Sequence, residues 1–510
     1  MFTSLNVSDF AFLTLGIVGL RYLLVKRGRA PHPPGPKGWP IIGNVLDMPT
    51  EKMWLVFAKW GERWGDIVYV NLLGQPMVFL NSANTAVETL DKKSSIYSDR
   101  PSFTMAGELA GWAPGLGFLH YGDRFRETRR LLHRVMGTKT NMEAFLPMVD
   151  LETRRFMKRV LNDPENVYEW IRKAAGATIL NLAYGYQVKE GHDEFVDLID
   201  RAMKQFSIMT TPNAFLVDAF PILRHVPSWF PGAGFKRIAA EYKETCTDMA
   251  NLPFEYVKQQ MASSAGTALP SFSSNHLESG KLTEEQDSII KWAACSLYAG
   301  GSDTTVSAIY TFFLAMTLFP DIQKKAQDEL DAVVGTDRLP VFGDREHLPY
   351  VEALVKEVFR WHPVAPLGVP HRLMEDDVHN GYLIPKGSIV IPNIWNILHN
   401  PDAYKNPMTF GPERFLPTPG NTAEPDPRTY CFGFGRRSFP EGLNLADASV
   451  FMTCAMTLSA FNITKALNAD GSVITPPAEF LDGTVSHPKP FQCSIRPRSS
   501  KSVALIHSSE

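Results

Sequence analysis

The chain has 510 residues, of which 44% are hydrophobic and 21% are charged, and its formal net charge is -3. This composition is typical of an ordered protein with a large core and excludes a disordered chain. The small net charge gives no reason to expect a nucleic-acid partner. The five cysteines are scattered, with no CxxC pair and no zinc-ligand spacing, so we expect a reduced protein without structural zinc.

Residues 1–29 hold an apolar run and a basic flank. The run extends from Phe10 to Val25, interrupted by Arg21, and the basic stretch Lys26 to Arg29 follows it. It is shorter than the ~20 residues of a spanning helix, so it predicts a marginal anchor, and the basic flank puts the body of the protein in the cytoplasm. A cleaved signal peptide would carry its basic residues before the apolar run instead. Asn6 starts a formal glycosylation sequence on the opposite side of the membrane.

Residues 30–44 are rich in proline and glycine. Pro31, Pro33, Pro34 and Pro36 cannot continue a helix and favour an extended segment, so we predict a hinge. No repeat or low-complexity linker divides the rest of the chain. We therefore expect one domain over residues 45–510.

The remaining elements predict a mainly α protein with small β-sheets. Residues 67–72 and 76–80 are β-like runs, and Gly74-Gln75 between them indicates a hairpin turn. Residues 381–392 and 491–495 have the proline, glycine and β-branched content of further short strands. Most of the rest has a helical pattern.

The strongest helix prediction begins at Thr283. Thr283 and Gln286 form a capping-box pattern, and Pro320 ends a segment of about 37 residues, or about 55 Å of helix. A second helix is predicted from Pro320 to Gly335. The first of these helices is long enough to cross the whole domain.

The middle of that long helix contains Ala299-Gly300-Gly301-Ser302-Asp303-Thr304-Thr305, a run of poor helix formers. One interpretation is a kink or a close helix contact. The other is a groove beside a bound ligand, in which Thr304 donates a hydrogen bond and Asp303 helps to move protons.

Glu357 and Arg360 are spaced for an ion pair on one helix face. The same spacing occurs at Glu127/Arg130, Glu152/Arg155 and Glu169/Arg172, so the spacing alone indicates little. What distinguishes Glu357 and Arg360 is the proline-rich setting around them and the segment Pro412-Glu413-Arg414-Phe415 downstream.

The segment Phe432-Gly433-Phe434-Gly435-Arg436-Arg437-Ser438-Phe439-Pro440-Glu441-Gly442 resembles the haem-binding loop of the cytochrome P450 monooxygenases. The family pattern is Phe-x-x-Gly-x-Arg-x-Cys-x-Gly, which Phe432, Gly435 and Arg437 match. Phe439 stands where the cysteine that ligates iron belongs, and a phenyl ring has no lone pair to offer a metal. Glu441 is an extra residue before Gly442. The sequence therefore predicts no metal ligand at this position.

The resemblance extends over almost the whole chain and implies the cytochrome P450 fold around haem b. By it, Asp303 and Thr304 would serve oxygen activation. The Glu-Arg-Arg triad of the family would be Glu357, Arg360 and Arg414, with a structural role. The haem propionates would bind Arg129, Arg372 and Arg437, with Phe125 in place of the tryptophan that usually precedes the first of these arginines.

The resemblance also implies function and setting, and is especially close to fungal enzymes of secondary metabolism. The protein would oxidise an apolar organic substrate, in secondary metabolism or xenobiotic oxidation, with dioxygen and electrons from NADPH. Its partners would be NADPH-cytochrome P450 reductase, the membrane and, as a second electron donor, cytochrome b5. We expect it on the endoplasmic reticulum membrane with its catalytic domain in the cytoplasm.

Two functional hypotheses arise from Phe439. In the first, the protein is a monooxygenase and the altered loop reflects a misassigned splice site or a local reading error. In the second, the chain is a degenerate, inactive relative that acts, if at all, as a binding protein. No replacement ligand is evident, because Cys431 lies eight positions upstream and no histidine occurs between His399 and His487.

Overall fold

The computed structural model describes residues 30–508, apart from 212–213, 264–267, 279–281, 418 and 421. The predicted anchor, residues 1–29, and Asn6 lie outside the described residues. The proline-rich segment 30–44 lies along the first strand of the sheet, where the Tyr69 N–H donates to the Pro34 carbonyl at 2.9 Å and the His32 ring stacks on Tyr69.

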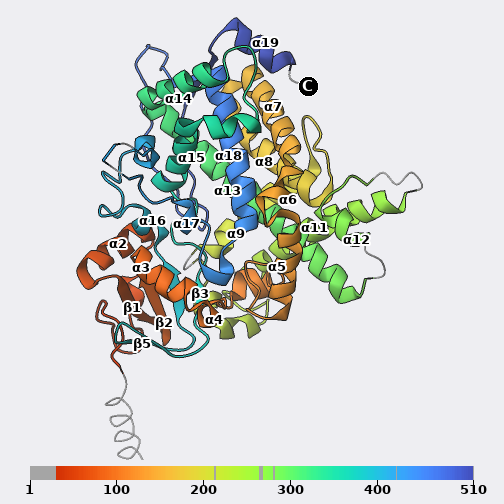
Figure 1. Cartoon of the computed structure of the whole chain (residues 1–510). Helices are drawn as coiled ribbons and strands as arrows, with labels where there is room; N and C mark the ends of the chain where they lie inside the picture. The colour runs from red at the N-terminus through yellow and green to blue at the C-terminus, as the bar shows by residue number, and fades with distance from the viewer. Residues whose placement is uncertain are drawn as a thin grey trace, which may run out of the picture.

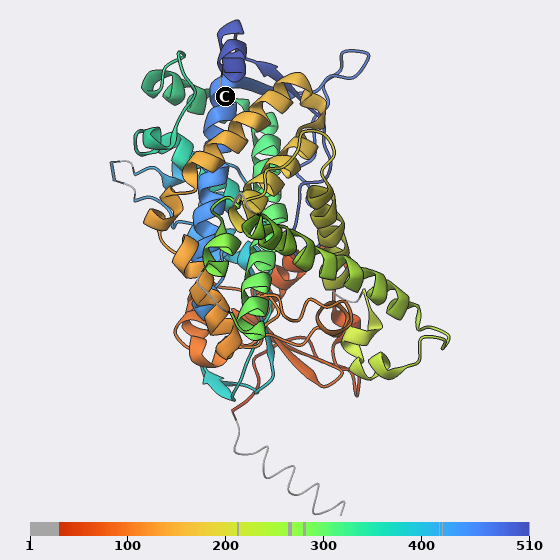
Figure 2. The same cartoon turned by 90° about the vertical axis from the view of Figure 1, so that its right-hand side faces the viewer.

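A long helix, α13 (Glu284–Leu318), runs through the middle of the molecule beside α18 (Pro440–Ala460), as Figures 1 and 2 show. Helices α5 (Asp123–Met136), α7 (Leu146–Asn162) and α8 (Val167–Tyr184) pack around this pair. Their contacts bury most of α13 and α18 in the main hydrophobic core.

The predicted start of α13 is confirmed. Thr283 caps the helix, with its side chain accepting from the Gln286 N–H while the Gln286 side chain accepts from the Thr283 N–H. The second predicted helix is α14 (Pro320–Val333), which leaves α13 at an angle of 106° because Pro320 has no N–H with which to continue the first helix.

The main sheet has the strand order β1-β2-β6-β3 and lies at one end of the molecule (Figure 1). The predicted hairpin is formed by β1 (Ile67–Leu72) and β2 (Gln75–Leu80). Its turn lies one residue earlier than predicted, at Leu73 and Gly74, both with positive φ, because Gln75 already pairs with Leu72. β6 (Ile389–Pro392) runs parallel to β2, and β3 (His371–Arg372) is antiparallel to β6, with His371 opposite Val390. Two further pairs form the small sheets, β4 (Asp377–His379) with β5 (Tyr382–Ile384) and β7 (Phe461–Lys465) with β8 (Cys493–Pro497).

The mainly α architecture with small sheets is therefore confirmed. The remaining helices are α2 (Met53–Trp64), α3 (Ala83–Ala86), α4 (Ser94–Tyr97), α6 (Lys139–Glu143), α9 (Glu194–Thr210), α10 (Leu216–Ala219), α11 (Gly234–Ala262), α12 (Phe272–Leu277), α15 (Pro349–Trp361), α16 (Ile394–Leu398), α17 (Arg428–Cys431) and α19 (Ser500–Ser508).

Within the described part of the chain, α18 is long and apolar enough to cross a membrane, and the bent pair α13 and α14 passes the same test. About two thirds of the apolar stretch of α18 is buried inside the protein. The apolar character of α18 is accounted for by its place in the core.

Candidate functional site

The loop between α17 and α18 is shaped by its glycines. Gly433 and Gly435 have φ of 87° and 55°, and a Cβ at Gly435 would lie 2.1 Å from the Leu90 carbonyl oxygen. The Gly435 N–H donates to the Asp91 carboxylate. Only glycine fits this close approach, so Gly435 fixes the path of the loop beside Leu90.

Phe439 lies at the end of this loop, directly before α18. Its N–H donates to the Phe432 carbonyl at 3.1 Å, and its ring lies against Gly442, where a Cβ would be 2.3 Å from Phe439 Cδ1. The Arg129 guanidinium lies 5.4 Å from the ring centroid, in a cation–π contact. The ring is thus held by contacts on two sides and presents no donor atom.

Of the cysteines that the structure describes, Cys431 is nearest to the ligand position along the chain. Cys431 is on α17, and burial raises the pKa of its thiol, which disfavours the thiolate that binds metals. Among the described residues no three His, Cys, Asp or Glu side chains lie together as a metal site.

Glu441 is not a loop residue, contrary to the sequence interpretation. It is the second residue of α18, and its side chain is fully buried. Glu441 Oε2 lies 3.2 Å from Arg129 Nη1, and Oε1 lies 3.5 Å from His133 Nδ1, one turn further along α5. Both oxygens lack a well-directed hydrogen bond, so the ion pair with Arg129 is the main stabilising contact shown for the carboxylate among the described residues.

Arg437 turns inward from the loop. Its Nε donates to the Ser98 carbonyl at 2.7 Å, its Nη2 donates to the Leu119 carbonyl at 2.6 Å, and its guanidinium lies 3.9 Å from the centroid of Phe125. Burial lowers the pKa of Arg437 to about 10. Phe125, at the position of the family tryptophan, thus provides a ring face for Arg437.

Arg100 is a site residue that sequence reasoning missed. Its side chain is buried, its Nη1 donates to the carbonyls of Val369 and Pro370 at 2.7 Å, and its Nε has no partner. Burial, and then the charge of Arg437, lower the pKa of Arg100 well below its usual value. A single arginine before a proline has no spacing pattern that could have identified it.

The structure places Arg372 on the outer side of β3. Its side chain is 43% exposed, and its Nη1 is 3.9 Å from Asp99 Oδ2. The preceding residue, His371, points inward, with its Nδ1 2.8 Å from the Tyr97 carbonyl oxygen. Successive residues of a strand point to opposite faces of the sheet, so His371 faces the interior and Arg372, the next residue, faces outward.

The middle of α13 is less buried than the stretches of the helix on either side of it. The Gly300 backbone is exposed, and a Cβ there would meet no atom within 4 Å, whereas a Cβ at Gly301 would lie 3.0 Å from Ile179 Cδ1. The Thr304 hydroxyl donates to the Gly300 carbonyl at 2.7 Å. Gly301 therefore allows close packing of α13 against Ile179, whereas Gly300 borders an open space.

Asp303 faces a different partner from Thr304. Its Oδ1 lies 3.2 Å from Nε2 of His487, which comes from the loop before β8. The buried Nδ1 of His487 has no hydrogen-bond partner. The structure therefore brings Asp303 and Thr304 to the same turn of α13 but gives them separate contacts.

Leu116 connects the arginine cluster to α13. Its N–H donates to Ser296 Oγ, one turn before Gly300, at 3.0 Å, and its carbonyl oxygen lies 3.4 Å from Arg437 Nη1. The buried arginines and the open space beside Gly300 thus belong to one region of the molecule.

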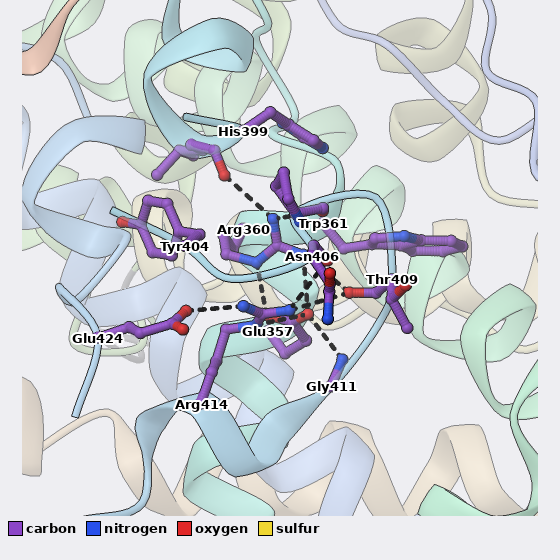
Figure 3. A network of polar contacts seen from close by, with 12 residues as sticks. Glu357, Arg360, Trp361, His399, Tyr404, Asn406, Thr409, Gly411, Arg414 and Glu424 are labelled. Atoms are coloured by element: carbon purple, nitrogen blue, oxygen red, sulfur yellow. Dashed lines mark hydrogen bonds and ion pairs between the residues drawn. The ribbon is translucent and has the colours of Figure 1, made fainter. Parts of the chain in front are cut away.

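The structure brings Glu357, Arg360 and Arg414 together, as Figure 3 shows. Glu357 and Arg360 are fully buried and joined by two hydrogen bonds of 2.7 and 2.8 Å, and Arg414 Nε lies 3.2 Å from the same carboxylate. The Gly411 N–H also donates to Glu357 at 2.8 Å. This network ties α15 to the segment before the loop.

These residues fit one part of haem and not another. Arg100 and Arg437 are buried cations, with a free Nε on Arg100, and suit the carboxylates at the edge of the macrocycle. Phe439 does not suit the iron, and Arg129 is engaged by Glu441.

Comparisons with known proteins identify the family. The family model described as Cytochrome P450 matches residues 33–495. The chain is 54% identical to Cytochrome P450 monooxygenase 208 of Postia placenta, over 97% of this chain and 96% of that protein. It is 49% identical to Cytochrome P450 monooxygenase claR of Ampulloclitocybe clavipes, over 98% and 93% of the two chains, and 39% identical to O-methylsterigmatocystin oxidoreductase of Aspergillus flavus, over 100% and 96%. With the helical fold described above, these matches show that the chain belongs to the cytochrome P450 family and has its fold.

Proposed function

We propose that the protein is a haem-dependent monooxygenase that inserts one atom of dioxygen into an apolar organic molecule, using electrons from NADPH. The observation that carries this proposal is the pairing of the buried arginines Arg100 and Arg437 with an open space at Gly300 and Thr304 on α13. This arrangement suits a planar dicarboxylate beside α13. The monooxygenase names of the relatives support the same reaction class.

The substrate class follows from the apolar segments expected to line the pocket. Residues 102–119 and 203–217 contain buried apolar side chains such as Met105, Trp112 and Met209, and residues 364–369 add partly buried ones. Such walls favour a terpenoid, polyketide, steroid or polycyclic aromatic. We place the protein in fungal secondary metabolism or xenobiotic oxidation, on the endoplasmic reticulum membrane. Its electron donor would be NADPH-cytochrome P450 reductase, with cytochrome b5 as a second donor.

The catalytic form in this proposal carries cysteine at position 439. The support is that the loss of the iron ligand and the extra residue both fall within one short segment, residues 439–441. The cluster formed by Glu357, Arg360 and Arg414 and the run around Thr304 are intact. A local misassignment of the coding sequence would produce such a pattern.

The second candidate is an inactive relative that binds a ligand without oxidising it. A specific observation favours it: both unusual residues have a partner, because Phe439 at the end of the loop and Glu441 in the first turn of α18 each contact Arg129. In this candidate Phe439 is the natural residue and the loop has adapted to the loss of the thiolate.

One pair of measurements discriminates between the two. Sequencing the transcript across codons 437–442 gives cysteine at the ligand position if the first candidate is right; a clean transcript encoding Phe439 rejects it. The reduced protein with Phe439, under carbon monoxide, should lack the red-shifted Soret band of a thiolate-ligated haem, and F439C should show it. That band in the protein with Phe439 would reject the second candidate.

A further inference from the structure

The region around Arg100 and Arg437 has more positive than negative charge. Both guanidiniums are buried, and burial, followed by the charge of Arg437, lowers the pKa of Arg100. The carboxylate that acts on both is Asp99, whose Oδ1 already accepts from the Tyr121 N–H at 2.9 Å and lies 3.0 Å from His120 Nδ1. Two buried cations therefore share one carboxylate that is already engaged, so a bound anion would be stabilised here.

Glu441 does not meet this need, because its carboxylate is paired with Arg129 on α5 and lies 3.5 Å from His133 Nδ1 of the same helix. Glu441 thus neutralises the half-buried Arg129 and leaves the two buried arginines, Arg100 and Arg437, for a ligand.

The same region has an open helix face and an apolar setting beside the two arginines. The Gly300 face of α13 is open, and Leu116 links it to Arg437. Phe125 and the other aromatic rings of the site present faces rather than donor atoms. A ligand held here would gain from carboxylate contacts and ring burial, and a metal at its centre would find no axial donor in the loop.

We propose that the chain with Phe439 is a binder of tetrapyrrole dicarboxylates whose affinity comes from the two carboxylates and the macrocycle and owes nothing to the iron. The pocket then recognises metal-free protoporphyrin as well as haem. This inference goes beyond the proposed function and holds or fails without any catalysis.

The test titrates the purified full chain, prepared without added haem, with haem and with protoporphyrin IX, following the quenching of tryptophan fluorescence. We expect dissociation constants within about threefold of one another. In F439C, haem should bind at least about tenfold more tightly than in the chain with Phe439, while protoporphyrin binding stays unchanged. Haem binding at least tenfold tighter than protoporphyrin in the chain with Phe439, or no binding of either, overturns the inference.

A ligand control removes the need for a variant that fails to fold. Protoporphyrin dimethyl ester keeps the macrocycle and lacks the carboxylates, so its binding should fall by at least about tenfold. Equal binding of the ester contradicts the role of the arginines. R100M should weaken protoporphyrin binding to a similar degree, with R338M, at an exposed arginine outside the site, as its control. The carbon monoxide spectrum of F439C tests the proposed function separately, so the two claims can fail independently.

Discussion

Arg129 and Glu441 form an ion pair of 3.2 Å that joins α5 to the first turn of α18. Glu441 is fully buried, whereas the Arg129 side chain is 19% exposed, so the carboxylate depends on this arginine more than the arginine depends on it. The position of Glu441 near the helix N-terminus adds a favourable interaction with the helix dipole.

Removing the Arg129 guanidinium should therefore lower the stability of the folded protein. We expect R129M to lower the free energy of unfolding by about 2–3 kcal/mol, somewhat less than for a fully buried pair because His133 remains nearby. The double variant R129M/E441Q should recover more than half of that loss, since no charge is left buried without a partner. R130M is the control; its pair with Glu127 is exposed on both sides and should change stability by less than about 0.5 kcal/mol. Urea unfolding measures all three, and equal losses in R129M and R130M would contradict the assignment.

Substitution of Glu357 should lower the free energy of unfolding strongly. E357Q leaves Arg360, which is fully buried, without its anion, and we expect a loss of about 3–5 kcal/mol in the free energy of unfolding. The matched control is D328N, which removes an exposed ion pair with Lys324 and should cost less than about 0.5 kcal/mol. The comparison is made by chemical denaturation, and a loss under about 1 kcal/mol for E357Q would refute the structural role.

Stability should fall in mild acid because of buried histidines. Burial, and then the charge of Arg360, lower the pKa of His399 to about 3, while the unfolded chain protonates it near its usual value of 6.5. The folded pKa is depressed, so this contribution is complete above about pH 6.5 and is lost as the pH falls toward 3. His399 alone should give a slope of about 1.4 kcal/mol per pH unit between pH 6 and 4.5.

H399Q should reduce that slope by the equivalent of one proton, measured by urea unfolding at several pH values. His225 is exposed, so H225Q should leave the slope unchanged. An unaltered slope in H399Q would mean that His399 is not buried in its neutral form. Burial also lowers the pKa values of His362 and His371, so these two histidines should account for the dependence of stability on pH that remains in H399Q.

The two glycines of α13 should respond in opposite ways to alanine. G300A adds a methyl group to open space and should stabilise the ligand-free chain by about 0.5–1 kcal/mol through helix propensity. G301A places its methyl group 3.0 Å from Ile179, so the gain should be cancelled or reversed. Thermal or urea unfolding of both variants checks this, and destabilisation by G300A would show that the space beside Gly300 is filled.

The elements with strong local signals were predictable from the sequence. The side chains of Thr283 and Gln286 each accept a hydrogen bond from the other residue's backbone N–H. Because this pattern spans only four residues, the start of α13 could be located before any tertiary contact was known. Pro320 marks the boundary between α13 and α14 for the equally local reason that it lacks an N–H.

The site was only partly predictable, because its remaining features depend on distant contacts. Nothing near Arg100 in the chain indicates that Val369 and Pro370 receive its hydrogen bonds, since these partners lie about 270 residues away. Glu441 appeared to be a loop insertion, but Pro440 is favourable at the first position of a helix and brings Glu441 into α18.

The early start of α18 explains how the extra residue is accommodated. One added residue inside an α-helix would turn every later side chain by about 100° and expose the buried face of α18. The side chains from Leu445 onward nevertheless pack into the core, and Arg437 keeps its place against Ser98 and Leu119. The extra residue falls between Arg437 and Gly442, where the Phe439 ring lies against Gly442 in the first turn of α18. The buried side chains of α18 fix the phase of the helix, so the short segment before them is the part of the chain that can take up an added residue.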